Sequence, residues 1–480
     1  MSQQKIRQEE QKIRRGMITV ALIIGAFVAI LNETFLNIAM ADLMKTFNVS
    51  ATTVQWLATS YMLVIGILMP VTALLAGWFT TRQMFLGAMA LFLLGTVICG
   101  FSPTFGFLLL GRVIQASGSG LLMPVMMNTI LYIYPAEKRG AAMGMIGLVI
   151  MFAPALGPTL SGLIISVFSW RWLFYLVIPL AVFSIAFAAR YLKNVSDVTR
   201  PAVEIPSIIL STVGFGGLVY GMGSSAEGGA VGPVMMMIGA VSLILFVWRQ
   251  LAIDHPILNL HTFKFPMYAL STIILILMMM TLFSTMILLP LYMQKVLLLS
   301  SFGAGLVLLP GGLINGFLSP IMGKLFDKFG PRWLVIPGML LMILVIFLMS
   351  RMNIAENTVY VVILYAVLLI GMAMVMMPVS TTGLNDLPKK LYPHGTAIMN
   401  TLEQVAGGIG TALFVGIMAS GQQAYLSRSA DPTNSGQIRQ AMVSGMSTAF
   451  LIAMILAVVS LILALFLKRT VSEEAQSEPH

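Results

Sequence analysis

The feature that most constrains this chain is a series of about fourteen apolar runs, each long enough to cross a lipid bilayer. A membrane helix needs roughly 20 apolar residues, and helices satisfy all their backbone groups internally. The chain is 58% hydrophobic and only 9% charged, whereas a soluble domain carries about 25% charged residues. The sequence therefore predicts an all-α integral membrane protein. The runs begin near Met17, Val54, Met84, Phe105, Gly140, Trp172, Pro206, Val231, Met267, Ser301, Leu334, Val359, Thr396 and Ser444.

Basic residues gather on one side of these spans. Of the 27 Lys and Arg residues, 20 lie at one set of span ends, six at the other, and Arg112 lies within a span. Basic residues favour the cytoplasmic side, so we expect both termini in the cytoplasm. The net charge of +10 is then a topology signal, and we expect no nucleic-acid partner. The six residues on the opposite side are Lys45, Arg171, Lys295, Arg351, Arg428 and Arg439.

An internal repeat divides the chain. The stretch "PVTALLAGWFTTR" (70–82) aligns without gaps with "PIMGKLFDKFGPR" (320–332), at an offset of 250 residues. Both stretches end the second span of a six-span block, and repeated halves are typical of secondary transporters. We predict a cytoplasmic N-terminal segment, a six-helix bundle, a linker with two extra helices, a second six-helix bundle and a cytoplasmic tail. Their predicted boundaries are 1–16, 17–192, 193–252, 253–468 and 469–480.

Two opposite charges lie at matching depth in the first half. Glu33, near the end of the first span, and Arg112, near the start of the fourth, are each about seven residues from the outer face, which is roughly 10 Å. Burying one charge alone costs several kcal/mol, so we expect the two to pair directly or through water. Glu33 is then either a structural partner of Arg112 or a carboxylate that gains and loses a proton during transport.

Five stretches resemble signature motifs of the major facilitator superfamily. "GKLFDKFGPR" (323–332) resembles its loop signature, and "GRVIQASGSG" (111–120) its fourth-span signature. "GMIGLVIMFAPALGPTLSG" (144–162) resembles the antiporter signature of the fifth span. "LNETFLNIA" (31–39) and "SWRWLFYLVIPL" (169–180) resemble motifs of the fourteen-span drug:proton antiporters, and the lincomycin-resistance exporters are the most similar group. The resemblance covers essentially the whole chain and implies the major facilitator fold, with two six-helix bundles plus two extra helices.

The chain departs from the family pattern at three positions. The first-span motif usually carries Asp where this chain has Asn32, and the acid stands one place later at Glu33. One residue turns a helix face by about 100°, which leaves open whether Glu33 faces the same cavity. Gly77 aligns with Asp327 of the second half, and Ala153 replaces one expected glycine.

The resemblance also implies a set of site residues around a central cavity between the bundles. Glu403, the second intramembrane acid, is a candidate second proton site or inner gate; the alternative is a carboxylate bonded to Asn400 and Gln404. We expect Gly157 and its neighbouring prolines to govern the alternation of the fifth span, and a charged cluster to latch one state. The candidates for coupling or substrate binding are Glu33, Arg112, Glu403, Asn32, Asn37 and Gln115. The conformational candidates are Gly157, Pro158, Pro154, Asp327 and Arg332.

These features predict a proton-coupled exporter of lipophilic drugs, including lincosamide-type antibiotics, that works by alternating access in the cell (inner) membrane. Export of one endogenous metabolite, lipid or siderophore is the alternative. The sequence contains no G-x-x-x-x-G-K-[ST] nucleotide motif, no nucleophile–base pair and no metal-ligand spacing. We therefore expect neither an ATP-driven pump nor an enzyme, no cofactor and no metal. The expected partners are lipophilic small molecules, protons and membrane lipid, and we expect a monomer.

Overall fold

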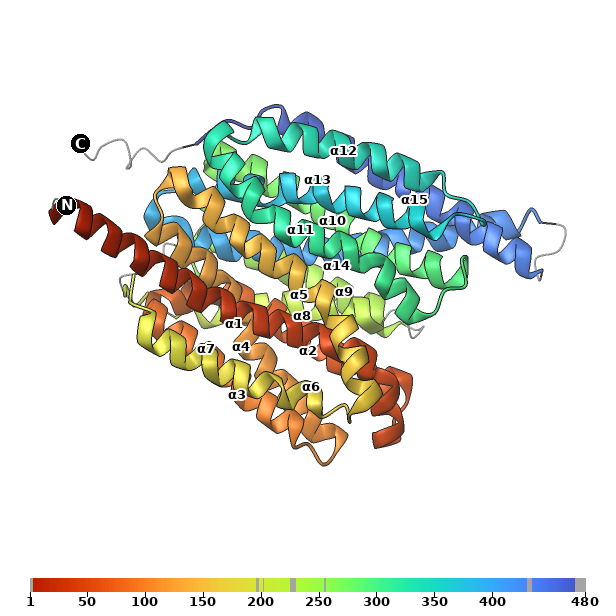
Figure 1. Ribbon diagram of the computed structural model, residues 1–480, viewed down its shortest axis with the longest axis horizontal. Helices are drawn as coiled ribbons and strands as arrows, with labels where there is room; N and C mark the ends of the chain where they lie inside the picture. Colours follow the sequence, from red (N-terminus) through yellow and green to blue (C-terminus); the bar gives the residue numbers. More distant parts are fainter. Residues whose placement is uncertain are drawn as a thin grey trace. The chain divides into compact units, whose positions relative to one another are not determined.

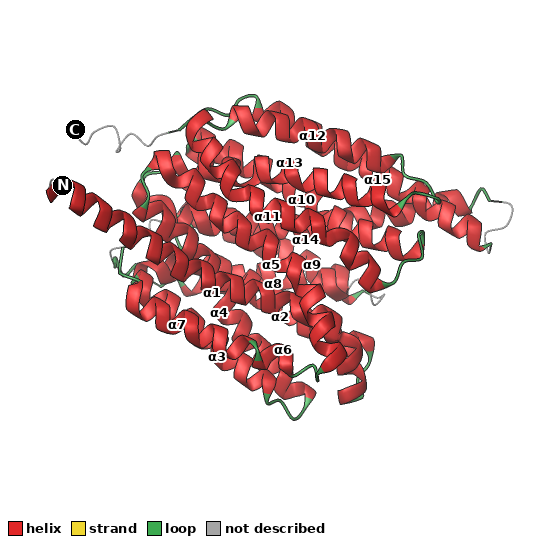
Figure 2. Cartoon of the chain, in the orientation of Figure 1, coloured by secondary structure: helices red, strands yellow, loops and turns green. Residues whose placement is uncertain are grey.

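The computed structural model describes residues 3–195, 198–201, 203–224, 230–253, 256–429 and 434–470. The side chains of residues 3–14 and of a few further helical residues, Asn37 and Pro158 among them, lie outside the described part. None of the described ranges contains a β-strand (Figure 2). The helices are α1 (Gln3–Phe47), α2 (Ala51–Trp78), α3 (Thr81–Gly100), α4 (Phe105–Ile133), α5 (Arg139–Val167), α6 (Trp172–Tyr175), α7 (Val177–Tyr191), α8 (Ile205–Ser224), α9 (Val231–Ala252), α10 (Pro266–Lys295), α11 (Ser301–Phe329), α12 (Arg332–Ser350), α13 (Thr358–Asn385), α14 (Tyr392–Leu426) and α15 (Ser435–Ala464).

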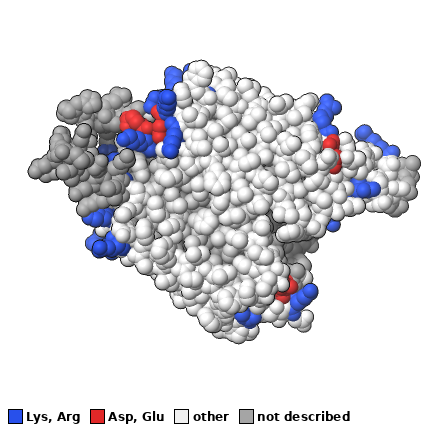
Figure 3. Space-filling model, viewed as in Figure 1, with Lys and Arg blue, Asp and Glu red and all other residues white. Residues whose placement is uncertain are grey.

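The predicted spans correspond to these helices one after another. Thirteen helices of the described chain are long and apolar enough to cross a membrane, and α6 and α7 together form the sixth span. The apolar stretch of α8, Ile205–Gly221, is shorter and corresponds to the seventh predicted span. On the face seen in Figure 3, Lys, Arg, Asp and Glu gather at helix ends and leave the helix middles uncharged. The prediction of an all-α membrane protein with about fourteen spans is confirmed.

The chain divides into two compact units. The first contains Met1–Ala142, Leu156–Phe263 and Leu387–Thr401, and the second contains Met143–Ala155, Lys264–Asp386 and Leu402–His480. In the first unit α1 packs beside α4 and α7, coloured from red to yellow in Figure 1. In the second unit α12 packs beside α13 and α15. The first unit also contains both extra helices, whereas part of α5 belongs to the second unit and the start of α14 to the first. The predicted domain boundaries stay predictions.

The repeat extends further towards the N-terminus than the sequence alignment indicates. Asn48 and Leu298, which are 250 residues apart, both adopt positive φ, at 52° and 57°. Two residues later, Ser50 and Ser300 cap the following helices: the Ser50 Oγ accepts from the Thr53 N–H (3.1 Å), and the Ser300 Oγ accepts from a backbone N–H at 3.0 Å. The same turn thus precedes the second helix of each half.

The aligned arginines also make corresponding contacts. Arg82 donates from Nη2 to the Ala189 carbonyl (2.6 Å), at the end of α7. Arg332 donates from Nε to the Leu467 carbonyl (2.6 Å), just after α15. In each half, the arginine at the start of the third span therefore binds a carbonyl at the end of the sixth. Basic groups near a helix C-terminus satisfy carbonyls that have no partner within the helix.

The departure at Gly77 has a steric cause. The Gly77 carbonyl accepts from the Thr199 and Arg200 N–H groups at 3.0 and 2.9 Å, so the segment after α7 lies directly against the end of α2. A Cβ at position 77 would lie 2.7 Å from the Pro201 Cδ. In the second half the Asp327 carbonyl accepts instead from a flexible side chain, that of Arg469, at 2.8 Å. A side chain fits at position 327 and not at 77 because different groups cover the two positions.

The two extra helices form a closely packed hairpin. A Cβ on Gly217 of α8 would lie 3.0 Å from the Gly239 Cα of α9, and one on Gly239 would lie 2.7 Å from the Leu218 nitrogen. Glycines permit this approach of two backbones, as is common between membrane helices. The Trp56 and Tyr220 rings, 5.3 Å apart between centroids, connect α8 to α2.

Candidate functional site

A buried arginine is the centre of the polar site in the first unit. Arg112 of α4 is 1% exposed. Its Nη1 donates to the Asn32 Oδ1 of α1 at 3.2 Å and to the Gln115 Oε1 at 2.6 Å. Its guanidinium carbon lies 3.9 Å from the centroid of the Tyr61 ring of α2. Two amide oxygens and an aromatic face therefore stabilise the cation in place of water.

Further hydrogen bonds extend this site to α3. Gln115 donates from Nε2 to the Thr96 Oγ1 (2.7 Å), and Thr96 donates to the Phe92 carbonyl (2.7 Å). The hydroxyls of Tyr61 and Ser119 are 2.5 Å apart. Sequence reasoning identified Gln115 but missed Tyr61 and Thr96. No motif marks Tyr61 or Thr96, so only the contact of each with Arg112 or Gln115 reveals a role.

Glu33 does not pair with Arg112 in the described part of the structure. It is partly exposed, and it has no hydrogen bond or ion pair there, although Arg112 acts on it electrostatically. The direct form of the expected pairing is therefore absent among the described residues, and a pairing through water stays a prediction. The reason is the helix rotation of about 100° per residue: Asn32 occupies the face towards Arg112, so Glu33 points elsewhere.

Two buried donors of this site have no partner among the described residues. They are the Asn32 Nδ2 and the Arg112 Nε. A buried donor without an acceptor costs about 1–3 kcal/mol, and such groups are rare in native proteins. Within the described part of the chain, the site thus has two donors without an acceptor and a neighbouring acid, Glu33, without a hydrogen bond.

Gly157 brings α5 into contact with α1 next to this acid. A Cβ at position 157 would overlap the Thr34 Oγ1 and would lie 2.8 Å from the Thr34 Cβ. Thr34 directly follows Glu33, so α5 can approach here only because residue 157 has no side chain. Pro154 lies in α5 in the part that joins the second unit. The side chains of Pro158 and Asn37 lie outside the described residues.

Glu403 of α14 belongs to the second unit. It is partly exposed and, like Glu33, has no hydrogen bond or ion pair with a described residue. The alternative, hydrogen bonds from Asn400 and Gln404 to Glu403, is absent among the described residues. The Asn400 Nδ2 donates instead to the Thr396 carbonyl at 2.8 Å and to the Met127 sulfur at 3.3 Å. Its role in coupling stays a prediction.

The latch candidates, Asp327 and Arg332, lie at the end of α11 and the start of α12. The Arg332 side chain and the Asp327 carbonyl contact the segment after α15, as given above, and Lys328 lies over the Phe329 ring at 5.1 Å. These contacts connect the second, third and sixth spans of one half. A latch function for the pair stays a prediction.

A cluster that sequence reasoning missed attaches the start of α14 to α4; we name it the α14 anchor. Arg139, 5% exposed, donates to the carbonyls of Leu131 (2.8 Å) and Tyr134 (3.0 Å) at the end of α4. It also donates to the Tyr392 hydroxyl at 3.0 Å, and its guanidinium lies over that ring. The sequence marks Arg139 only as a topology charge, because its partner is 253 residues away.

Two more contacts complete the α14 anchor. Thr396 donates to the Asn128 Oδ1 at 2.8 Å, and the Tyr132 hydroxyl donates to the Lys389 carbonyl at 3.3 Å. Residues 387–401 of the second predicted bundle are therefore held in the first unit by hydrogen bonds.

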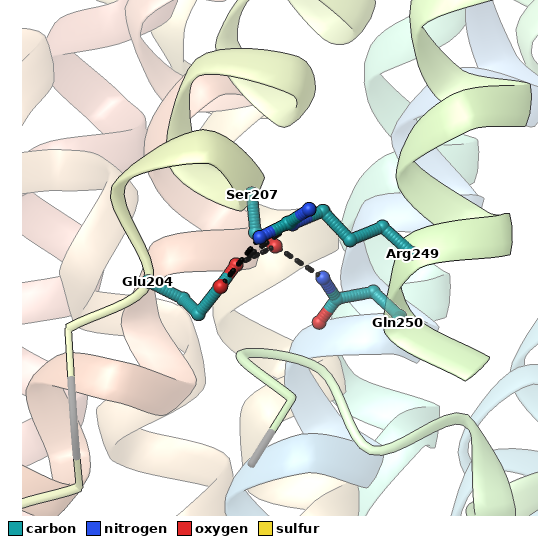
Figure 4. Close-up of polar contacts among 4 residues, drawn as sticks. All are labelled: Glu204, Ser207, Arg249 and Gln250. Carbon is teal, nitrogen blue, oxygen red and sulfur yellow. Dashed lines mark hydrogen bonds and ion pairs between the residues drawn. The ribbon is translucent and has the colours of Figure 1, made fainter. Parts of the chain in front are cut away.

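Polar contacts also join the ends of the extra helices (Figure 4). Arg249 of α9 donates to both carboxylate oxygens of Glu204, at 3.0 and 2.7 Å. Ser207 of α8 donates to Glu204 at 2.7 Å, and Gln250 donates to Ser207 at 2.8 Å. The Gln250 Oε1 accepts from the Leu258 N–H at 3.0 Å. The hydrogen bonds from Arg249 and Ser207 lower the pKa of Glu204 to about 2.

This cluster predicts an acid-sensitive stability. The lowered pKa means that the folded state prefers the ionised carboxylate, so its stabilising effect is complete above about pH 4.5. The effect is lost as the pH falls from about 4.5 towards 2. We expect Glu204→Gln to lower the melting temperature by a few degrees at pH 7 and by much less at pH 2.5. The effect at pH 7 is small because solvent screens the pair, whose Glu204 and Arg249 side chains are 24% and 32% exposed. Thermal unfolding in detergent measures this.

The matched control is Glu137→Gln, which removes an exposed acid from the turn before α5. It should leave the melting temperature unchanged at both pH values. An equal effect of Glu204→Gln at pH 7 and pH 2.5 would contradict the ion-pair explanation.

The described chain contains no group of three or more His, Cys, Asp or Glu residues placed to hold a metal ion.

Comparison with known proteins places these features in a family context. A family model described as Major Facilitator Superfamily matches residues 22–411. Lincomycin resistance protein LmrB of Bacillus subtilis (strain 168) is 50% identical over 457 residues, which cover 94% of this chain and 95% of that protein. Multidrug resistance protein B homolog of Mycobacterium tuberculosis (strain ATCC 25618 / H37Rv) is 26% identical over 417 residues, covering 85% of this chain and 77% of that protein.

Two solved structures share the fold. The crystal structure of the human organic anion transporter MFSD10 matches with a TM-score of 0.64 at 12% identity, covering 92% of this chain and 99% of that one. The proton:xylose symporter XylE, bound to 6-bromo-6-deoxy-D-glucose, matches with a TM-score of 0.64 at 16% identity, covering 96% and 97%. At these identities the likeness establishes the fold alone.

Proposed function

The chain belongs to the major facilitator superfamily, and on this basis we propose that it is a proton-coupled exporter of lipophilic drugs that works by alternating access. The observation that carries drug export is the 50% identity, over 94% of the chain, to a protein named for lincomycin resistance. Lincosamide-type antibiotics are therefore the first substrates to test. The proton gradient supplies the energy, and no cofactor takes part.

The polar site of the first unit supports the coupling role of Glu33. Its carboxylate has no hydrogen bond among the described residues, while the Arg112 Nε and the Asn32 Nδ2 have no acceptor. In our proposal, an ionised Glu33 turns towards these donors or holds a cationic substrate. A protonated Glu33 turns away, as in the geometry described above. Competition between proton and substrate for one carboxylate couples their movements in opposite directions.

The other candidate residues take supporting roles in this proposal. Asn32 and Gln115 position Arg112, and Gly157 allows α5 to move against α1 at the level of Glu33. Glu403 is a second proton site, in the other unit. Asn37 and Pro158 keep the roles that the resemblance implies, and Pro154 acts with them in α5. Asp327 and Arg332 hold the loop end of the second half in one state.

Transport by purified protein tests the proposal. In proteoliposomes with an imposed proton gradient, lincomycin should move against its concentration gradient, and an uncoupler should stop the movement. Addition of lincomycin without an imposed gradient should release protons in the opposite direction. Movement that an uncoupler does not affect would contradict proton coupling. Proton-coupled movement of other lipophilic drugs but not of lincomycin would support the proposed mechanism and contradict lincomycin as a substrate.

We further propose that the protein acts as a monomer in the cell membrane with both termini in the cytoplasm. The support for this topology is the distribution of basic residues, 20 on one side and six on the other. Epitope tags before Ser2 and after His480 should be inaccessible to antibody in intact cells and accessible after permeabilisation. A tag inserted after Arg428, on the proposed outer side, is the control and should be accessible in both. Labelling of either terminus in intact cells would contradict this topology.

A further inference from the structure

A cavity of about 640 Å³ lies at one end of the first unit. Its volume is within the range of sites that bind small molecules. Its walls are the C-terminal ends of α2 and α4, the start of α3, the start of α14, and residues on either side of the extra-helix hairpin. These last residues are Val195, Thr199 and Pro201 before the hairpin and Pro256, Ile257 and Asn259 after it. All of these are helix ends or connections, so the cavity lies where the spans meet the membrane surface.

The cavity combines a basic rim with an apolar interior. Lys389 and Lys390 lie at the rim, and both are exposed. Among the described residues that line the cavity, none is Asp or Glu. Leu74, Met84 and Val125, which are buried, form part of the inner wall. This arrangement suits a molecule with an anionic head and an apolar body.

Contacts within the first unit fix the position of the rim. The Tyr132 hydroxyl donates to the Lys389 carbonyl at 3.3 Å. The His394 Nδ1 lies 3.3 Å from the Asn259 nitrogen and 3.1 Å from the Ile257 oxygen, which holds the segment 256–259 against α14. The two lysines are therefore held at the mouth of the cavity.

We propose that this cavity binds the headgroup and upper acyl region of an acidic phospholipid. Charge complementarity identifies the occupant. The described lining has two lysines and no acid, so it attracts an anionic phosphodiester whose headgroup carries no positive charge. Bilayer lipid is also the amphiphile present at every helix end, and basic sites between membrane helices on the cytoplasmic side bind such headgroups. The cytoplasmic location rests on the proposed topology.

Lipid retention tests the proposal without any transport measurement. The full-length protein is reconstituted in phosphatidylcholine with increasing phosphatidylglycerol, and native mass spectrometry measures the retained lipid. We expect one tightly retained phosphatidylglycerol. A lysine near a membrane surface contributes about 1 kcal/mol to the binding of acidic lipid, so the double variant Lys389→Gln, Lys390→Gln should lose about 25-fold in preference for phosphatidylglycerol. The matched control is Lys264→Gln, an exposed lysine outside the cavity, which should change nothing.

A second variant tests the contribution of the cavity to lipid binding separately from that of the lysine charges. Ala76→Phe fills the cavity while both lysines remain, and it should remove the retained lipid without changing the melting temperature. If Ala76→Phe alters folding, the double lysine variant alone tests whether the cavity binds the lipid. Equal retention by the double lysine variant and the parent would overturn the proposal. Displacement of the lipid by millimolar inorganic phosphate would identify a site for free anions and would overturn lipid as the occupant. Neither outcome depends on whether the protein exports lincomycin.

Discussion

Glu33→Gln is expected to reduce lincomycin-driven proton release in proteoliposomes to the level of empty liposomes. The amide keeps the size of the side chain and its hydrogen-bonding capacity but cannot release a proton. In the structure, Glu33 has no bonded partner among the described residues and lies next to Asn32, which holds Arg112 at 3.2 Å. Coupling requires this carboxylate to exist in two charge states, and the variant permits only one. Counterflow of drug without a gradient should continue, because alternation itself needs no proton transfer through position 33.

Two further variants define the geometry of this requirement. Glu33→Asp should keep partial activity with a shifted pH optimum. Asn32→Asp in the Glu33→Gln background should restore part of the coupling, because position 32 faces Arg112 and carries the acid in the resembling transporters. If Glu33→Gln releases protons as well as the parent does, the coupling role passes to Glu403, and Glu403→Gln should then abolish the release.

Arg112→Ala is expected to destabilise the protein by about 1–3 kcal/mol, the usual cost of leaving a buried acceptor without its donor. Arg112 is 1% exposed, and its loss leaves the Asn32 and Gln115 oxygens without their donor. It also removes the cation from the face of the Tyr61 ring, and it leaves a cavity in the wall between α1, α2 and α4. Thermal unfolding in detergent measures the loss of stability.

Arg112→Lys tests the positive charge of this side chain separately from the planar geometry of its guanidinium. An ammonium keeps the positive charge, but it has a single centre and cannot reproduce the planar guanidinium stacked on Tyr61. We expect about half of the destabilisation of the alanine variant, and a larger loss of transport than of stability. Arg190→Lys, at an exposed arginine on the end of α7, is the matched control and should behave as the parent. Parent-like unfolding of Arg112→Ala would mean that the network around Arg112 does not stabilise the fold.

The sequence by itself determined the spans and the repeat. Lipid offers no partners for backbone groups, so each apolar run of sufficient length had to be a helix, and the predicted span starts lie within a few residues of most observed helix starts. The cost of burying charge in lipid also singled out Glu33, Arg112 and Glu403 from their positions along the chain alone. The offset of 250 residues was visible in the sequence only for 70–82 and 320–332, whereas the matching turns at Asn48 and Leu298 and the matching contacts of Arg82 and Arg332 come from the structure.

Only the tertiary structure decided which side chains meet. A rotation of α1 by one residue places Asn32, and not Glu33, against Arg112, and an apolar span gives no periodic signal that fixes such a rotation, because lipid-facing and buried positions are both apolar. Tyr61 and Thr96 join the site through neighbouring helices, and Arg139 reaches Tyr392 across 253 residues of sequence. These contacts depend on the packing of whole helices against one another, and local sequence carries no record of that packing.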